Sequence, residues 1–249
     1  MPMFTSSFGF GIGMSQAAGA ARFYNYWMSR TGSGYGETGQ MIDAKVDVFG
    51  NIYTLYDKRI LTKMDSVGNI LWSFFYSLPA PERGFETGLP GTNGSLALDP
   101  NQDIIYHHTT ASPYFHGVTK ISKTDGSVLW TRTTSEDANG WIGLIATGVT
   151  VDPAGNIYIA CQDGLGSGPD HDLWDRSYLI VKFNNDGAFQ WQRKIAMGTQ
   201  VSTTNLNDSP YTIVASYTHV YFGGMLGQYG DLKFFGALTV DGILSWAKY

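Results

Sequence analysis

Four tryptophans recur at nearly even spacing along the chain, and each one follows a glycine by four residues. They are Trp72, Trp130, Trp191 and Trp246, and the intervals between them are 58, 61 and 55 residues. A repeat of this length, with turn glycines and strand aromatics, is typical of one supersecondary unit copied several times. The repeat constrains the architecture of the chain more tightly than its function.

Each unit is predicted to contain four short antiparallel strands. The first two flank a tight turn such as Asp152-Pro-Ala-Gly-Asn156, in which proline presets one φ angle and glycine or asparagine tolerates a positive one. The third strand carries a lysine among apolar residues, at Lys63, Lys120 and Lys182. A second tight turn then leads to the tryptophan strand. The last unit is the most divergent, with Gly236-Ala237-Leu238 where the lysine is expected.

Side chains alternate between the two faces of a strand, so each sheet presents aromatic and aliphatic residues that need cover. Radial stacking of the sheets around a closed ring supplies that cover. We therefore predict an all-β fold, a small β-propeller of about four four-stranded blades over residues 41–249. Residues 1–40 are predicted to form an extended N-terminal arm and a linker strand.

Five blades are the alternative, because Trp27 resembles the last strand of a blade whose other strands are missing. The Trp27 strand lacks the glycine four residues earlier, where Phe23 stands instead. This strand could close the ring beside the last blade, cover a sheet edge, or add to the sheet of a neighbouring subunit.

The run Asp-x-x-Gly-Asn-Ile-Tyr, the lysine strand and the Asp-Gly-x-x-x-Trp segment together resemble the β-propeller repeats of the SBBP and PQQ-like type. The stretch from Trp27 to Gly39 resembles the link between consecutive SBBP-like units. The resemblance implies the fold and leaves the function open, because such repeats occur on unrelated proteins. Quinone-dependent dehydrogenases are similar in blade pattern but longer, and their cofactor pocket often includes vicinal cysteines. This chain has one cysteine, so we expect no cofactor and no enzymatic activity.

Composition narrows the range of partners. The net charge is −5 and the 16 basic residues form no run, which disfavours nucleic-acid binding. No segment reaches the roughly 18 uninterrupted apolar residues of a membrane span. The single Cys161 excludes an intrachain disulfide and is expected to be a buried thiol.

Two polar clusters are candidate metal sites, and both have a simpler interpretation. The loop from Asp163 to Asp175 carries several carboxylates, which suit Ca²⁺, but it lacks the EF-hand spacing and is expected to be a solvated loop. His107 and His108 are adjacent in a predicted strand, so their side chains point to opposite faces and do not easily share a metal, although His116 could pair with one of them. We predict no catalytic, cofactor-binding or metal-binding residues.

Aromatic residues in the predicted loops are the better indication of binding. Aromatic side chains bind sugars or protein partners through their flat faces, whereas the alternative is that they pack between blades. The candidate surface-binding residues are Phe85, Tyr114, Phe115, Trp141 and Trp174.

Residues 1–21 contain no charged residue, whereas a free solvated tail would normally be polar or charged. We therefore expect this arm to be buried against a partner in an assembly. The candidate partner-binding residues of the arm are Phe4, Phe8, Phe10, Ile12 and Met14. A short leader rich in glycine and phenylalanine, ahead of a compact β-domain, is similar in composition to those of tailed-bacteriophage virion proteins.

That similarity implies a non-enzymatic structural or attachment subunit of a bacteriophage particle, located in the virion. Its partners would be other virion proteins, through the arm, and a host-surface glycan or protein, with several copies in a symmetric assembly. One alternative is a secreted or cell-surface propeller that binds glycan or protein. Another is an enzyme acting on surface polysaccharide through loop carboxylates such as Glu82, Glu86, Glu136 and Asp137.

Overall fold

The fold is entirely β in the part of the chain that can be described. The computed structural model describes residues 41–56, 60–75, 95–109, 116–133, 142–164, 177–195, 209–226 and 232–248. These ranges hold sixteen strands and no helix. The strands form four four-stranded antiparallel sheets, each a meander in chain order. The predicted all-β propeller fold with four blades is confirmed, while Trp27 and the arm lie outside the described residues.

Each blade takes four consecutive strands. The first blade contains β1 (Met41–Val46), β2 (Ile52–Tyr56), β3 (Ile60–Met64) and β4 (Ile70–Phe75). The second contains β5 (Ser95–Leu98), β6 (Ile104–Thr109), β7 (His116–Ile121) and β8 (Val128–Thr133). The third contains β9 (Ile142–Val151), β10 (Ile157–Gly164), β11 (Ser177–Phe183) and β12 (Phe189–Ile195). The fourth contains β13 (Ser209–Ala215), β14 (His219–Leu226), β15 (Leu232–Thr239) and β16 (Leu244–Lys248).

The turn between the first two strands of a blade forms as its sequence predicts. In the third blade, Oδ1 of Asp152 accepts hydrogen bonds from the backbone N–H groups of Ala154 and Asn156, both at 2.9 Å. Gly155 has a φ of 89°, in the left-handed region that favours glycine. The second blade places Gln102 in the same region, with a φ of 68°. The turn geometry therefore persists where the glycine is absent.

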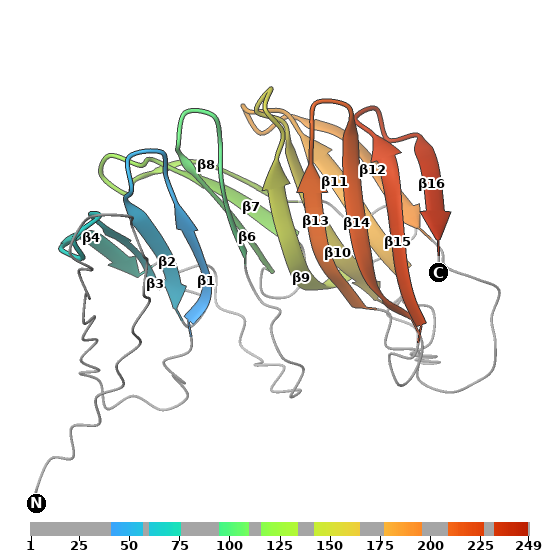
Figure 1. The fold of residues 1–249 in the computed structure, drawn as a ribbon, viewed down its shortest axis with the longest axis horizontal. Coiled ribbons are helices and arrows are strands. Elements are labelled where there is room, and N and C mark those ends of the chain that lie inside the picture. Colours follow the sequence, from blue (N-terminus) through green and yellow to red (C-terminus); the bar gives the residue numbers. More distant parts are fainter. Residues whose placement is uncertain are drawn as a thin grey trace, which may run out of the picture.

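The four blades lie side by side in chain order (Figure 1). Because each blade is a meander, its first and third turns lie at one edge, which we call the hairpin edge. The remaining connections begin and end at the opposite edge, which we call the connection edge. The repeat therefore places its short turns on one side of the molecule and its non-repeating segments on the other.

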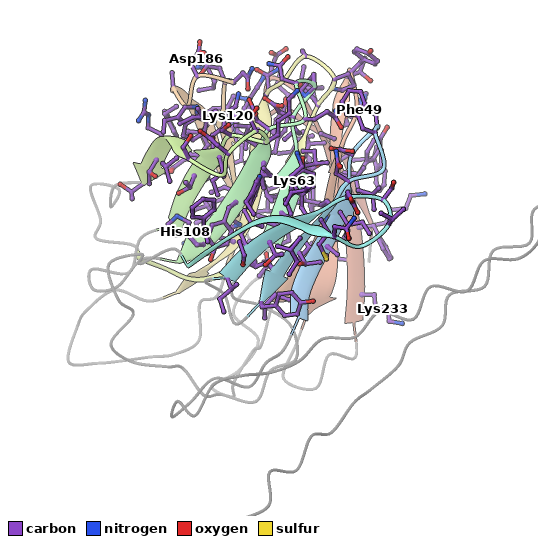
Figure 2. The ribbon with its side chains drawn as sticks, turned by 90° about the vertical axis from the view of Figure 1, so that its left-hand side faces the viewer. Phe49, Lys63, His108, Lys120, Asp186 and Lys233 are labelled. Carbon is purple, nitrogen blue, oxygen red and sulfur yellow. The ribbon has the colours of Figure 1, made fainter. Side chains whose placement is uncertain are left out.

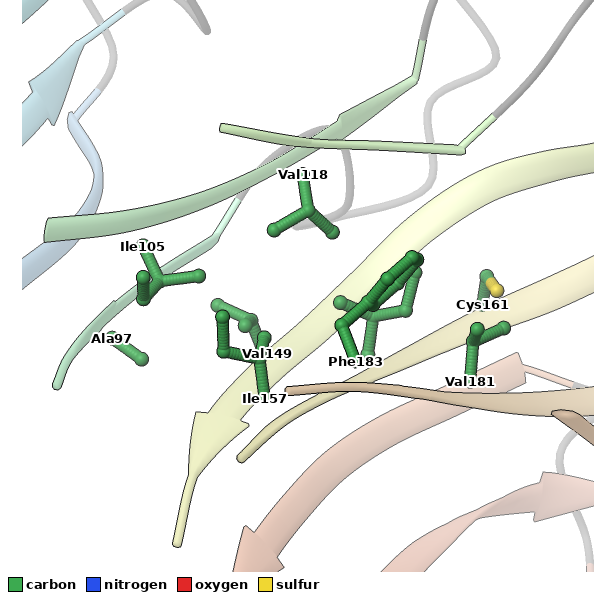
Figure 3. Close-up of a cluster of buried hydrophobic side chains, with 9 residues drawn as sticks. Ala97, Ile105, Val118, Val149, Ile157, Cys161, Val181 and Phe183 are labelled. Atoms are coloured by element: carbon green, nitrogen blue, oxygen red, sulfur yellow. The ribbon is translucent and has the colours of Figure 1, made fainter. Parts of the chain in front are cut away.

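Apolar side chains fill the space between neighbouring blades. Figure 3 shows the cluster between the second and third blades, where Ile105 and Val118 face Val149, Ile157 and other residues of the third blade. Similar clusters join the first blade to the second and the third to the fourth. Cys161 is a buried thiol outside any disulfide and belongs to the cluster of Figure 3, as predicted.

The row of blades is open in the described part of the chain. Its apolar clusters join neighbouring blades, and the first and fourth blades lie at opposite ends of the row (Figure 1). Radial stacking predicts contact between these two blades, and the described strands do not make it. Ring closure therefore stays a prediction, and the outward faces of the first and fourth blades do not pack against each other in the described part of the chain.

Candidate functional site

The repeated lysine and tryptophan hold each blade to the next one. In the first blade, Tyr53, Lys63 and Trp72 lie opposite one another on adjacent strands. The backbone carbonyl oxygen of Lys123, in the β7–β8 hairpin of the second blade, accepts from Lys63 Nζ at 2.7 Å and lies 3.4 Å from the donor Trp72 Nε1. Figure 2 shows Lys63 and Lys120 among the packed side chains of the blades.

The third blade repeats this arrangement. Lys182 Nζ and Trp191 Nε1 both donate to the carbonyl oxygen of Val240, at 2.8 and 3.1 Å, in the β15–β16 hairpin of the fourth blade. Gly242 in that hairpin has a φ of 80°, and a Cβ there would lie 3.0 Å from the Trp191 ring. Glycine is therefore needed both for the turn and for the docking of the tryptophan.

The second blade uses its lysine differently, because two residues of the repeat are replaced. Asp103 stands where the first and third blades have asparagine, and Ile105 stands where the other three blades have tyrosine. Lys120 Nζ forms an ion pair with Asp99 Oδ2 at 2.8 Å and donates to Asn185 Oδ1 of the third blade, also at 2.8 Å. The Asp99 side chain is fully buried. This buried ion pair was not predicted. Its signal in the sequence is that the asparagine and the tyrosine, which bind the turn aspartate in the first and third blades, are replaced by Asp103 and Ile105.

The turn aspartates of the first and third blades are satisfied by neutral donors. Asp47 Oδ2 accepts from Asn51 Nδ2 at 2.8 Å and from Tyr53 OH at 3.1 Å. Burial acts to raise the pKa of Asp47, but the hydrogen bonds from Asn51, Phe49 and Tyr53 outweigh it and hold that pKa below its ordinary value. Burial and the neighbouring Asp47 charge raise the pKa of Tyr53 far above its ordinary value.

A lowered carboxyl pKa predicts acid sensitivity. Because Asp47 has a lower pKa folded than unfolded, its ionised form contributes stability above the unfolded value of about 4. That contribution is lost as the pH falls through the folded pKa. We expect denaturant midpoints measured from pH 6 to pH 3 to fall less steeply for Asp47→Asn than for the unsubstituted chain. Parallel curves for the two proteins would contradict this assignment.

The predicted histidines lie in β6 with separate partners. His107 Nδ1 lies 3.0 Å from the carbonyl oxygen of Gly148, and His108 Nε2 lies 3.0 Å from Thr119 Oγ1. Among the described residues, no group of three or more His, Cys, Asp or Glu side chains is arranged to hold a metal ion. The side chains of His116 and Asp163 lie outside the described part of the chain, as do residues 165–175 of the acidic loop.

The predicted binding aromatics also lie outside the described residues, but the structure describes the strands on either side of the segments that contain them. Segments 76–94, 110–115, 134–141 and 165–176 contain Phe85, Tyr114, Phe115, Trp141 and Trp174, and each segment starts and ends at the connection edge. The arm residues Phe4, Phe8, Phe10, Ile12 and Met14 are likewise not described. In the described ranges, no helix is long and apolar enough to cross a membrane.

One surface was missed by sequence reasoning, and it lies on the side of the fourth blade that faces away from the third. Val214, Tyr221, Ala237 and Trp246 form a cross-strand row there. The Tyr221 side chain is 42% exposed, whereas Tyr158, at the same position of the third blade, is 0% exposed. We call Val214, Tyr221, Phe235 and Trp246, with Ala237 between them, the terminal face of the fourth blade. The loss of the lysine was visible in the sequence, but the exposed face that accompanies it was not.

Comparison with known proteins supports the fold alone. No protein-family model matches the chain, and no curated protein matches it in sequence. Hydrazine synthase of Kuenenia stuttgartiensis is similar in structure, with a TM-score of 0.53 and 14% identity over 80% of this chain and 52% of that one. A quinohemoprotein alcohol dehydrogenase of Pseudomonas putida HK5 has a TM-score of 0.52 and 12% identity over 84% of this chain and 36% of that one.

Both similar structures are β-propeller proteins. At these identities the likeness concerns the backbone architecture. The chain spans about half of the hydrazine synthase chain and about a third of the dehydrogenase chain. The four described blades therefore correspond to part of a larger protein in each case.

Proposed function

We propose that the chain is a non-enzymatic structural or attachment subunit of a bacteriophage particle. The observation that supports this role is the use of the repeated polar side chains inside the molecule. Lys63, Lys120 and Lys182 bind the next blade, and Asp47 and Asp152 bind their own turns. The repeat is then a rigid scaffold, and recognition falls to the segments that do not repeat.

In this proposal the connection edge is the recognition surface. Its segments carry the aromatic side chains that suit a host glycan or protein. The uncharged arm, residues 1–21, anchors the propeller to other virion proteins. Several copies on one symmetric particle would then strengthen weak individual contacts through avidity.

The anchoring role is tested by deleting residues 2–21 from the phage-encoded protein. We expect the shortened chain to keep its thermal unfolding transition and to be missing from purified particles. A chain in which these residues are replaced by a Gly/Ser segment of equal length is the matched control for length, and it should also be missing. Normal incorporation of either variant, or a processed N-terminus found by mass spectrometry in the secreted fraction, would contradict the anchor.

The recognition role is tested by measuring the binding of labelled chain to host cells. Trp141→Ala and Trp174→Ala are expected to weaken binding by about tenfold or more if their rings contact the receptor. Phe49→Ala is the matched control, because Phe49 is an exposed aromatic at the hairpin edge. Equal losses for all three variants would contradict recognition at the connection edge. Release of sugar from host polysaccharide, abolished by Glu82→Gln or Glu86→Gln, would instead establish the enzymatic alternative.

A further inference from the structure

The terminal face of the fourth blade has the construction of an inter-blade face. In the first and third blades the equivalent row carries Tyr, Lys and Trp, and the next blade covers it. In the fourth blade four large apolar side chains of this face stay exposed, by 57% for Val214, 55% for Phe235, 43% for Trp246 and 42% for Tyr221. Contiguous exposed apolar residues of this kind mark interaction surfaces.

The one systematic change in this row is the exchange of lysine for Ala237. In the other blades the lysine is buried and finds its acceptor on the following hairpin. A cation on this face would need such an acceptor, since an unpaired buried charge is costly. Ala237 removes that requirement, so the centre of the face is neutral and needs no hairpin carbonyl opposite it.

We infer that the terminal face binds the same face of a second copy of this chain, giving a two-fold symmetric dimer. Two-fold dimers use one surface patch on both copies, so the patch must tolerate its own charges. A lysine at position 237 would bring two positive charges together across the axis, whereas alanine brings none. This inference goes beyond the proposed function and does not depend on a phage role.

The remaining charges suit an antiparallel arrangement of the two faces. Lys248 pairs with Phe235 across adjacent strands, and Lys233 lies two residues before Phe235, so both lysines share this side of the sheet near the connection edge. With the strands of the two copies antiparallel, the lysine end of one face lies at the hairpin end of the other. The cations of the two copies are then separated and remain at the solvated rim.

The opposite end of the row, on the first blade, presents a different surface. On the first blade, Thr54, Thr62 and Met64 alternate with the residues that pack against the second blade, so they point away from it. These three side chains are nevertheless buried in the single chain. On the same face, however, Val46 and Ile70 are exposed by 63% and 64%. Only part of this face is covered in the single chain, so head-to-tail stacking is the competing arrangement that an Ile70 variant tests.

Ala237→Lys is the decisive variant, because the first three blades carry lysine at this position and fold with it. We expect the full chain to sediment as a concentration-dependent dimer. Ala237→Lys should weaken the dimer by at least about 100-fold while keeping the thermal midpoint measured on the monomer at high dilution. Phe235→Ser provides a second variant that removes apolar area without adding charge, and it should also weaken the dimer.

Ile70→Ser is the matched control, since Ile70 is an exposed apolar residue of the first blade. It should leave the dimer unchanged. The inference is overturned if the chain is monomeric up to millimolar concentration, or if Ala237→Lys and Phe235→Ser leave the dimer intact. It is also overturned if Ile70→Ser weakens association as much as they do, or if oligomers grow without limit, because both results indicate head-to-tail stacking.

Discussion

Replacing Lys120 by methionine is expected to lower the free energy of unfolding by about 3–5 kcal/mol. The methionine fills most of the space of the lysine stem but leaves Asp99 without its cation. The Asp99 side chain is fully buried, and its Oδ2 lies 2.8 Å from Lys120 Nζ. Removing one partner of such a pair leaves an uncompensated charge in the interior, which costs more than the pair contributes.

The double variant Lys120→Met with Asp99→Asn separates two effects of the single substitution: the unpaired charge left on Asp99 and the packing lost with the lysine side chain. Asparagine removes the charge and keeps an oxygen for the backbone N–H of Asp103, which donates to Asp99 Oδ1 at 2.9 Å. We expect the double variant to recover more than half of the loss in urea unfolding. A double variant that is no more stable than Lys120→Met would show that the ion pair is not the source of the effect.

Lys63→Met is the matched control in the first blade. Its ammonium donates to a backbone carbonyl, which also faces Trp72 Nε1. Among the described residues, no carboxylate forms an ion pair with Lys63. We expect a smaller loss, about 1–2 kcal/mol. The difference between the two losses tests whether Asp99 depends on the charge of Lys120. In the first and third blades the equivalent aspartate is bound by neutral side-chain donors, which Asp103 and Ile105 cannot supply in the second blade.

The local parts of this fold follow from the sequence because their causes are local. Asp152-Pro-Ala-Gly-Asn156 contains the turn acceptor, the preset φ and the left-handed glycine within five residues, and the structure forms that turn. The divergent fourth blade shows the limit of the pattern. Ser216 stands in place of the aspartate, and its Oγ accepts from the backbone N–H of His219 at 3.1 Å, so the hairpin survives with a different acceptor.

Contacts between blades could not be predicted in the same way. The lysine strand was recognised, but its carbonyl acceptor lies about one repeat further along the chain, 60 residues away for Lys63 and 58 for Lys182. Neither residue type nor spacing identifies a backbone oxygen as the partner. The number of blades follows from counting tryptophans, whereas ring closure depends on how the outward faces of the first and fourth blades meet.

The candidate binding residues stay predictions for a related reason. They lie in loops, and loops lack the hydrophobic periodicity from which strands are predicted.

Replacing Asp152 by alanine is expected to lower the free energy of unfolding by about 3 kcal/mol. Asp152 accepts four hydrogen bonds, from the backbone N–H groups of Ala154 and Asn156, from Asn156 Nδ2 and from Tyr158 OH. Tyr158 is completely buried, so its hydroxyl has no access to water after the substitution. The cost comes mainly from donors left without an acceptor in the interior.

Asn184→Ala in the same blade provides the comparison that isolates burial. Asn184 Oδ1 accepts from the backbone N–H groups of Ala188 and Asp186, at 2.7 and 3.1 Å, in a turn of similar design that is partly exposed. Water replaces the lost acceptor there, so we expect a loss of about 0.5–1 kcal/mol in the same urea titration.

A Tyr158→Phe variant then completes a double-mutant cycle with Asp152→Ala. If the orphaned hydroxyl carries much of the cost, the two substitutions together should destabilise the chain by clearly less than the sum of the single losses. Additive losses, or equal losses for Asp152→Ala and Asn184→Ala, would mean that the aspartate acts only through its turn. The expected coupling would instead show that the buried Tyr158 hydroxyl is a main reason why the third blade needs an acid at its first turn.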